Sequence, residues 1–163
     1  MAFDLTDVLA GVRASRSFFL KHVDGLTPEQ WSWKPYPGCK GVRETLVHLI
    51  VGDRMAMNSL KTGGMPEDFE GFIAAIDSEA ADDTNEELIA RVNRERETLL
   101  AYIEETYAGK ELDAPTSLYG GGMKLGAAAA YLSGEDFYHA GQIAFIRLAT
   151  NPDWNYYGEI YGF

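Results

Sequence analysis

Apolar residues recur three and four positions apart through four long segments of the chain, and this spacing constrains the fold more than any other feature of the sequence. Such spacing lines up one face of an α-helix. The predicted helices cover residues 5–23, 41–61, 84–107 and 124–150. No segment shows the alternation of apolar and polar residues that is typical of a strand. We therefore predict an all-α chain that folds as a four-helix bundle.

Local signals mark where helices begin and where the chain turns. Thr27 precedes Pro28, and Gln30 completes a capping box, so a short helical turn is predicted there. Thr84 and Glu87 form a second capping box at the start of the third long helix. Residues 62–83 are rich in glycine and acidic residues, which predicts a loop with one small helix. No repeat or linker divides the chain, so residues 1–163 are predicted to form a single domain.

Charge and composition exclude several classes of function. The chain carries 14 Lys and Arg against 25 Asp and Glu, and the net charge of -11 has the wrong sign for nucleic acid or an anionic membrane. No apolar run approaches the roughly 20 residues that cross a bilayer, and no signal peptide is evident, so a cytoplasmic location is predicted. Cys39 is the single cysteine, so any metal site must use histidine and carboxylate ligands.

Three residues form the candidate metal site. Glu135 and His139 are four apart on the last long helix, on the stripe that Leu132 continues, so they are predicted to face the core. A carboxylate buried there must be paired, protonated or bound to a metal. His48 on the second long helix could meet them across the bundle. Two imidazoles and one carboxylate suit zinc, nickel or non-haem iron, and they leave coordination positions open for water or substrate.

Other interpretations of these polar residues remain open. A glutamate and a histidine four apart often form an ordinary salt bridge with a nearby basic side chain. Asp53 could orient a ligand imidazole, although an ion pair with a basic side chain elsewhere in the bundle is the favoured interpretation. Gln142 could hydrogen-bond near the site or serve helix packing. His22, near the end of the first helix, is interpreted as a structural cation.

Aromatic residues and glycines fill the connections. Trp31, Trp33 and Tyr36, together with the tail at residues 154–163, are expected to cover the ends of the bundle or to form an interface. The glycines at 120–122 lack the spacing of a phosphate-binding loop. They predict a flexible connection or a rim over the metal pocket. Cys39 has no activating neighbours beyond Lys40 and is expected to be inert.

Four fragments, in their order and spacing, carry a resemblance to a known family. They are Gly25 to Trp31, Lys34-Pro35, Glu44 to Leu49, and His139 to Ile143 followed by Arg147. Over nearly its whole length the chain resembles the DinB-like, or YfiT-like, family of metal-binding four-helix bundles. The resemblance implies that one histidine of the second helix and two histidines of the last helix bind one divalent metal ion, usually zinc or nickel. His48 and His139 match two of these ligands, and Glu135 stands where the family commonly has the third.

The resemblance also implies a function. Related proteins are metal-dependent and either transfer a low-molecular-weight thiol to a small electrophilic molecule or hydrolyse a substrate, through a metal-bound thiolate or water. The charge of Glu135 lowers the positive charge left on the site by one, which weakens Lewis acidity. No general acid or base can be assigned from the sequence, so the catalytic residues stay unknown. A homodimer is also implied.

Two alternatives to an enzyme remain. The first is a non-catalytic metal- or ligand-binding stress-response dimer, in which Glu135 has altered or removed the metal. The second is a scaffold in which Glu135, His139 and Asp53 form buried ion pairs with Arg147 or another basic side chain. The scaffold would carry no metal, and its stability would not respond to a chelator.

Overall fold

The computed structural model describes residues 3–163, and its regular elements are helices apart from one isolated bridge between Pro115 and Lys124. In chain order they are α1 (Leu5–Val23), α2 (Pro28–Ser32), α3 (Val42–Thr62), α4 (Phe69–Ala80), α5 (Asn85–Thr106), the 3-10 helix η1 (Leu118–Gly120), α6 (Leu125–Thr150) and α7 (Tyr156–Tyr161). The all-α prediction is confirmed. Residues 3–163 contain seven α-helices: the four long ones correspond to the four predicted segments, and three short ones lie outside them, so the chain is not a bundle of four helices alone. Over residues 3–163, no helix combines the length and the apolar character needed to cross a membrane.

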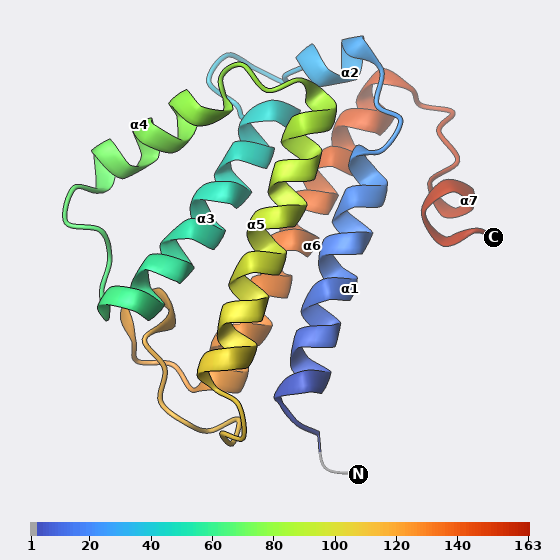
Figure 1. Cartoon of the computed structure of the whole chain (residues 1–163). Helices are drawn as coiled ribbons and strands as arrows, with labels where there is room; N and C mark the ends of the chain where they lie inside the picture. The colour runs from blue at the N-terminus through green and yellow to red at the C-terminus, as the bar shows by residue number, and fades with distance from the viewer. Residues whose placement is uncertain (1–2) are drawn as a thin grey trace.

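The four long helices lie side by side, and the three shorter ones lie outside them (Figure 1). α1 packs along α6, and α3 packs along α5, whereas α3 and α6 contact each other far less. Cavities open in the resulting space, which we call the α3–α6 groove. α2 crosses one end of the bundle, and α4 flanks α3 (Figure 1).

The predicted helix starts agree with the structure at both capping boxes. The Thr27 hydroxyl accepts a hydrogen bond from the backbone N–H of Gln30, and the Thr84 hydroxyl accepts one from the backbone N–H of Glu87. The short helix expected within residues 62–83 is α4. α7 was not predicted from the sequence, because six residues are too few to show a helical period.

The core consists of two apolar clusters with charged residues between them. Along α1, Arg16 lies between Val12 of one cluster and Phe19 of the other. Asp53 on α3, Arg96 on α5 and Asp136 on α6 occupy the same position relative to the clusters. Each long helix therefore contributes one buried charge at the level where the two clusters meet.

These four charges pair in a closed ring, which we call the ion-pair ring. Arg16 contacts Asp136 at 2.8 Å and Asp53 at 3.2 Å. Arg96 contacts Asp53 at 2.9 Å and Asp136 at 3.0 Å. All four side chains are at most 2% exposed, and their charges sum to zero. The favoured interpretation of Asp53 as an ion-pair partner is confirmed.

Arg147 has a different role from the one considered in the scaffold alternative. Its Nε donates to the His22 carbonyl at 2.8 Å, and its Nη2 donates to the Asp24 carbonyl. The guanidinium also lies over the Trp154 ring, 4.9 Å from the centroid. Arg147 thus caps the carboxyl end of α1, and no ion pair joins it to Asp53, Glu135 or His139 among the residues that the structure describes.

His22 is expected to make stability depend on pH. Burial lowers the pKa of its imidazole below the usual 6.5, and the nearby charge of Arg147 acts in the same direction. Near pH 7 the ring is therefore neutral in the folded protein, so His22 does not act as a cation at the end of α1. Below about pH 6.5 the His22 imidazole binds a proton more readily in the unfolded chain than in the folded protein, so the free energy of unfolding falls as the pH falls.

Urea unfolding of the metal-free protein between about pH 7.5 and 5 tests this dependence. The wild type should lose more stability over that interval than the His22→Gln variant, which has no imidazole to protonate at this position. Equal losses in the two proteins would show that His22 has the same pKa folded and unfolded.

Candidate metal site

Three potential ligand atoms converge in the α3–α6 groove. Glu135 Oε2 lies 3.6 Å from His139 Nε2 and 4.0 Å from His48 Nε2. All three atoms lie within 4.8 Å of one another, and the two imidazole rings are 5.0 Å apart between centroids. α3 supplies His48, and adjacent turns of α6 supply the other two. The structure therefore brings together the three residues predicted from the sequence.

His139 is the most informative member of the group. Its side chain is 3% exposed, and its Nδ1 lies 2.7 Å from Gln142 Oε1. Because an amide oxygen can only accept, Nδ1 carries a proton, which leaves Nε2 as the ring nitrogen that can bind a cation. That Nε2 is buried and has no hydrogen-bond partner among residues 3–163, and a buried polar atom left unpaired costs about 1–3 kcal/mol. A cation between the three residues would satisfy it, so the donor set fits a divalent metal ion.

His48 offers a second lone pair. Its side chain is 39% exposed, toward the groove. Partial burial lowers the pKa of its imidazole, and the charge of Lys40 acts in the same direction, whereas Glu135 opposes them. The ring is therefore neutral at physiological pH, which is the form that binds a metal.

The prediction that Glu135 faces the core is wrong in its rotation about the α6 axis. Its side chain is 36% exposed on the groove, and the neighbouring Asp136 is the buried carboxylate of α6. The buried stripe of α6 runs through Leu132, Asp136, His139 and Ala140, so Glu135 lies at its edge. Sequence spacing alone could not show which of two adjacent carboxylates, Glu135 or Asp136, enters the core. Only Asp136 is matched by arginines from two other helices.

The ordinary salt-bridge interpretation of Glu135 does not hold. Within residues 3–163, its carboxylate lies within 4.0 Å of the imidazole nitrogens of His48 and His139 and pairs with no lysine or arginine. The group is therefore a nitrogen, nitrogen, oxygen set without its own counter-charge. Such a set suits zinc, nickel or iron(II).

Two cavities flank this group within the groove. The α2-side cavity, of about 640 Å³, is lined by His48, His139 and the loop before α3, including Cys39 and Lys40. The η1-side cavity, of about 260 Å³, is lined by His48, Glu135 and Tyr119. Each cavity is bordered by two of the three candidate ligands, so small molecules could reach the site from either side. The Cys39 thiol donates a hydrogen bond to the Lys40 carbonyl, and Cys39 lines the α2-side cavity.

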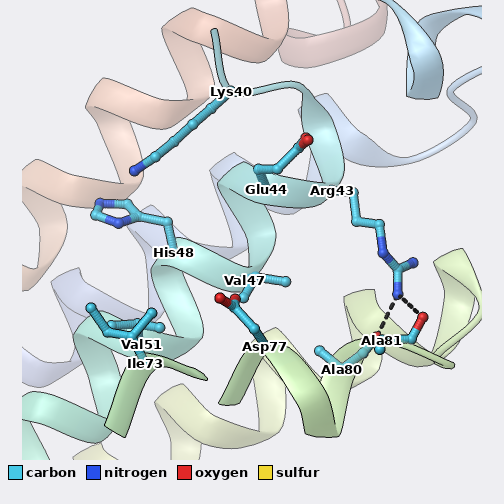
Figure 2. Close-up of a pocket in the computed structure, with 10 residues that line it drawn as sticks. All are labelled: Lys40, Arg43, Glu44, Val47, His48, Val51, Ile73, Asp77, Ala80 and Ala81. Atoms are coloured by element: carbon cyan, nitrogen blue, oxygen red, sulfur yellow. Dashed lines mark hydrogen bonds between the residues drawn. The ribbon is translucent and has the colours of Figure 1, made fainter. Parts of the chain in front are cut away.

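A third cavity, of about 450 Å³, lies between α3 and α4 and is shown in Figure 2. His48 and Lys40 border it, and the Lys40 side chain extends toward the imidazole (Figure 2). Arg43 is occupied by the carbonyls of Ala80 and Ala81 at the end of α4. Neither of the other two candidate ligands borders this cavity, so it is not part of the metal site.

Sequence comparison identifies the family. The sequence profile of the DinB superfamily matches residues 12–143, which include all three candidate ligands. The chain belongs to the DinB superfamily. No curated protein and no solved structure matches it. In this DinB-superfamily chain the three converging side chains are two imidazoles, His48 and His139, and the carboxylate of Glu135.

Gln142 is expected to tune the affinity of the site, because it fixes the His139 tautomer through a 2.7 Å hydrogen bond. Loss of such an outer partner typically lowers metal affinity by about 10- to 100-fold. Zinc titration of Gln142→Leu against a chromophoric chelator should show a loss in this range. Gln142→Glu keeps an acceptor at Nδ1 and serves as the matched control. Unchanged affinity in Gln142→Leu would mean that the His139 ring is held by packing alone.

Proposed function

We propose that this DinB-superfamily protein is a metal-dependent enzyme that acts on a small molecule through one divalent ion bound by His48, Glu135 and His139. The observation that carries the proposal is the buried, unpartnered Nε2 of His139, which faces two other potential ligands. The nitrogen, nitrogen, oxygen set favours zinc or nickel, and iron(II) is compatible with it.

The proposed reaction is transfer of a low-molecular-weight thiol, with hydrolysis as the second reaction type. When bound, a divalent ion supplies positive charge that lowers the pKa of an adjacent thiol or water. In the transfer the thiol loses its proton, a carbon–sulfur bond forms, and the leaving group departs from that carbon with its electron pair. In hydrolysis water takes the place of the thiol.

The residues of the chain assist by position and charge. His139 is held by Gln142, and His48 is kept neutral by partial burial and by Lys40, so both nitrogens are ready to bind a cation. Glu135 adds one negative charge, which moderates the positive charge of the site. A moderated charge favours a thiol over water, because a thiol ionises more readily and needs less activation.

Elemental analysis tests the proposed site. Untagged protein purified without chelator should contain about one equivalent of zinc, nickel or iron. The His48→Ala and Glu135→Ala variants should each lose it, because each removes one of three ligands. His22→Gln and Glu29→Ala, which alter a histidine and a glutamate outside the group, should keep the metal. A wild type without metal even after incubation with zinc and nickel would overturn the proposal.

Thiol consumption separates catalysis from binding. The metal-loaded protein should accelerate the reaction of cysteine with an aryl chloride, and His48→Ala should not. A protein that holds one equivalent of metal but turns over neither this pair nor a hydrolysable ester panel would be the non-catalytic binding protein considered above.

We also propose that the chain forms a homodimer through aromatic residues around α1, α6 and α7. Phe137 is 54% exposed, Tyr161 48% and Phe163 89%. Phe18 joins the first two, with ring centroids 5.6 and 5.8 Å away, and Tyr161 stacks on Phe163 at 5.8 Å. Aromatic side chains concentrated in this way are typical of interfaces. Sedimentation equilibrium should give a dimer for the wild type and a monomer for Phe137→Ser with Phe163→Ser.

A further inference from the structure

The three candidate ligands, His48, Glu135 and His139, are called the metal group below. The two cavities of the α3–α6 groove lie on opposite sides of this group along the helices. α6 reaches the η1-side cavity at Tyr131 and Glu135, and it reaches the α2-side cavity at His139 and Gln142. His48 is the one residue that lines both. A ligand in either cavity therefore meets the metal group from its own side, and two ligands could meet there together.

Each cavity is bordered by a helical glycine. Gly52 of α3 lines the η1-side cavity, and Gly141 of α6 lines the α2-side cavity. A Cβ built on either glycine would meet nothing within 4 Å, so neither glycine is required for close packing. Glycine inside a helix costs about 0.5–1 kcal/mol relative to alanine. What glycine provides at these two positions is open space next to the metal group.

The walls of the η1-side cavity are apolar and aromatic. Leu49 and Met55 of α3 line it together with Tyr119 and Tyr131, whose rings lie 5.2 Å apart between centroids in an edge arrangement. Asp53 and Arg96 also border the cavity, but both are held in the ion-pair ring and contribute no net charge. A volume of about 260 Å³ exceeds the roughly 150 Å³ that holds benzene.

Tyr119 is held over this cavity by an unusual backbone. Its φ of 54° lies in the left-handed region, where a tyrosine is rare and strained. The three glycines that follow it, at 120–122, also have positive φ. Burial raises the pKa of the Tyr119 hydroxyl well above its usual value, so the hydroxyl remains protonated. The loop between α5 and α6 therefore presents a neutral aromatic wall to the groove.

The α2-side cavity has a different character. Lys40 lines it, and within residues 3–163 no carboxylate pairs with this lysine, whereas the nearby Lys34 is paired with Glu44. Figure 2 shows the Lys40 side chain running toward His48. In a chain of net charge -11, an unpaired cation beside the site attracts anionic groups. A polar or anionic reactant is suited to this side.

We propose that the η1-side cavity is the binding site for a small, uncharged, apolar substrate, such as one with a single aromatic ring, which is bound on the opposite side of the metal group from the polar reactant. This inference rests on the proposed function and names the class of its second substrate. It assigns Tyr119 and Gly52 as specificity-determining residues. Tyr119 forms a wall of the cavity, and Gly52 of α3 leaves the space that a side chain would fill.

Ligand binding to metal-free protein tests the proposal without any activity. Fluorine NMR titration with 4-fluorotoluene should show saturable binding to the wild type. Leucine at position 52 would occupy the cavity, so Gly52→Leu should weaken that binding by at least about tenfold. Gly141→Leu, on the other side of the metal group, and Gly134→Leu, which borders no described cavity on α6, should leave it within about twofold. The anionic probe 4-fluorobenzoate should bind the wild type at least about tenfold more weakly.

The outcomes separate this inference from the proposed function. Leucine in place of a helical glycine with open space around it should preserve or raise stability, and thermal unfolding of each variant checks that it folds. Elemental analysis should find the same metal content in all three variants as in the wild type. No saturable binding, or binding that Gly141→Leu abolishes and Gly52→Leu does not, would overturn the assignment of the η1-side cavity while leaving the metal site intact. A wild type that takes up no metal even after incubation with zinc and nickel, but whose probe binding is still weakened by Gly52→Leu, would overturn the proposed function alone.

Discussion

Replacing Asp136 by asparagine should lower the free energy of unfolding by about 3–5 kcal/mol. Asp136 is fully buried and accepts hydrogen bonds from Ser15, Arg16 and Arg96. Asparagine has nearly the same shape but no charge, so two buried guanidinium groups would share the single carboxylate of Asp53. A buried charge left without compensation is far more costly than an absent ion pair, because the protein interior solvates it poorly.

Urea and thermal unfolding in the presence of a chelator measure this effect apart from any metal bound at the neighbouring Glu135. For a chain of this length the expected loss corresponds to roughly 2–4 °C in Tm for each kcal/mol. Asp82→Asn, at an exposed position without an ion pair, is the matched control and should change stability by less than about 0.5 kcal/mol. A loss below about 1 kcal/mol in Asp136→Asn would mean that water reaches the ion-pair ring and solvates the arginines.

Replacing Glu135 by glutamine should lower zinc affinity by at least about 100-fold, the upper end of the loss seen when an outer partner is removed. The substitution keeps the size of the side chain and removes the one anionic ligand, which lies 3.6 Å from His139 Nε2 and 4.0 Å from His48 Nε2. An amide oxygen is a weaker ligand for zinc or nickel than a carboxylate or an imidazole. Chelator competition at a fixed pH measures the change.

Glu135→His is the informative control for this experiment. It places a third imidazole where the carboxylate stands, so zinc affinity should stay within about tenfold of the wild type. The more positive site should also lower the pKa of a bound water, which the pH dependence of ester hydrolysis would report. Equal affinity in Glu135→Gln and in the wild type would show that Glu135 is not a ligand.

Most of the fold could be predicted from the sequence, because the apolar residues of a long amphipathic helix recur with the helical period. The predicted segment 5–23 is α1, and residues 124–150 contain α6 with a difference of one residue at its start. The DinB resemblance is confirmed by the family match. The short α7 lay beyond this reasoning, since one and a half turns rest on tertiary contacts and not on periodicity.

The candidate ligands could also be named from the sequence, but their surroundings could not. His48, Glu135 and His139 meet as expected. Asp136 enters the core because arginines from two other helices pair with it. Pairing between distant helices produces no local pattern in the sequence. The position of Tyr119 depends on the left-handed loop, of which the glycine run gave only a hint. Cavities result from side chains that are distant in sequence, so no spacing reveals them.

The ion-pair ring fixes the register of α3 and α6, the two helices that carry the candidate ligands. Asp53 lies five residues after His48 on α3, and Asp136 is adjacent to Glu135 on α6. A slip of either helix by one turn, about 5.4 Å, would break the ring, so the helices keep their register whether or not a metal is present. Preorganisation of the ligand atoms is thus supplied by residues that never touch the ion. An imidazole in place of the Glu135 carboxylate would therefore change the charge of the site and leave the ion-pair ring intact.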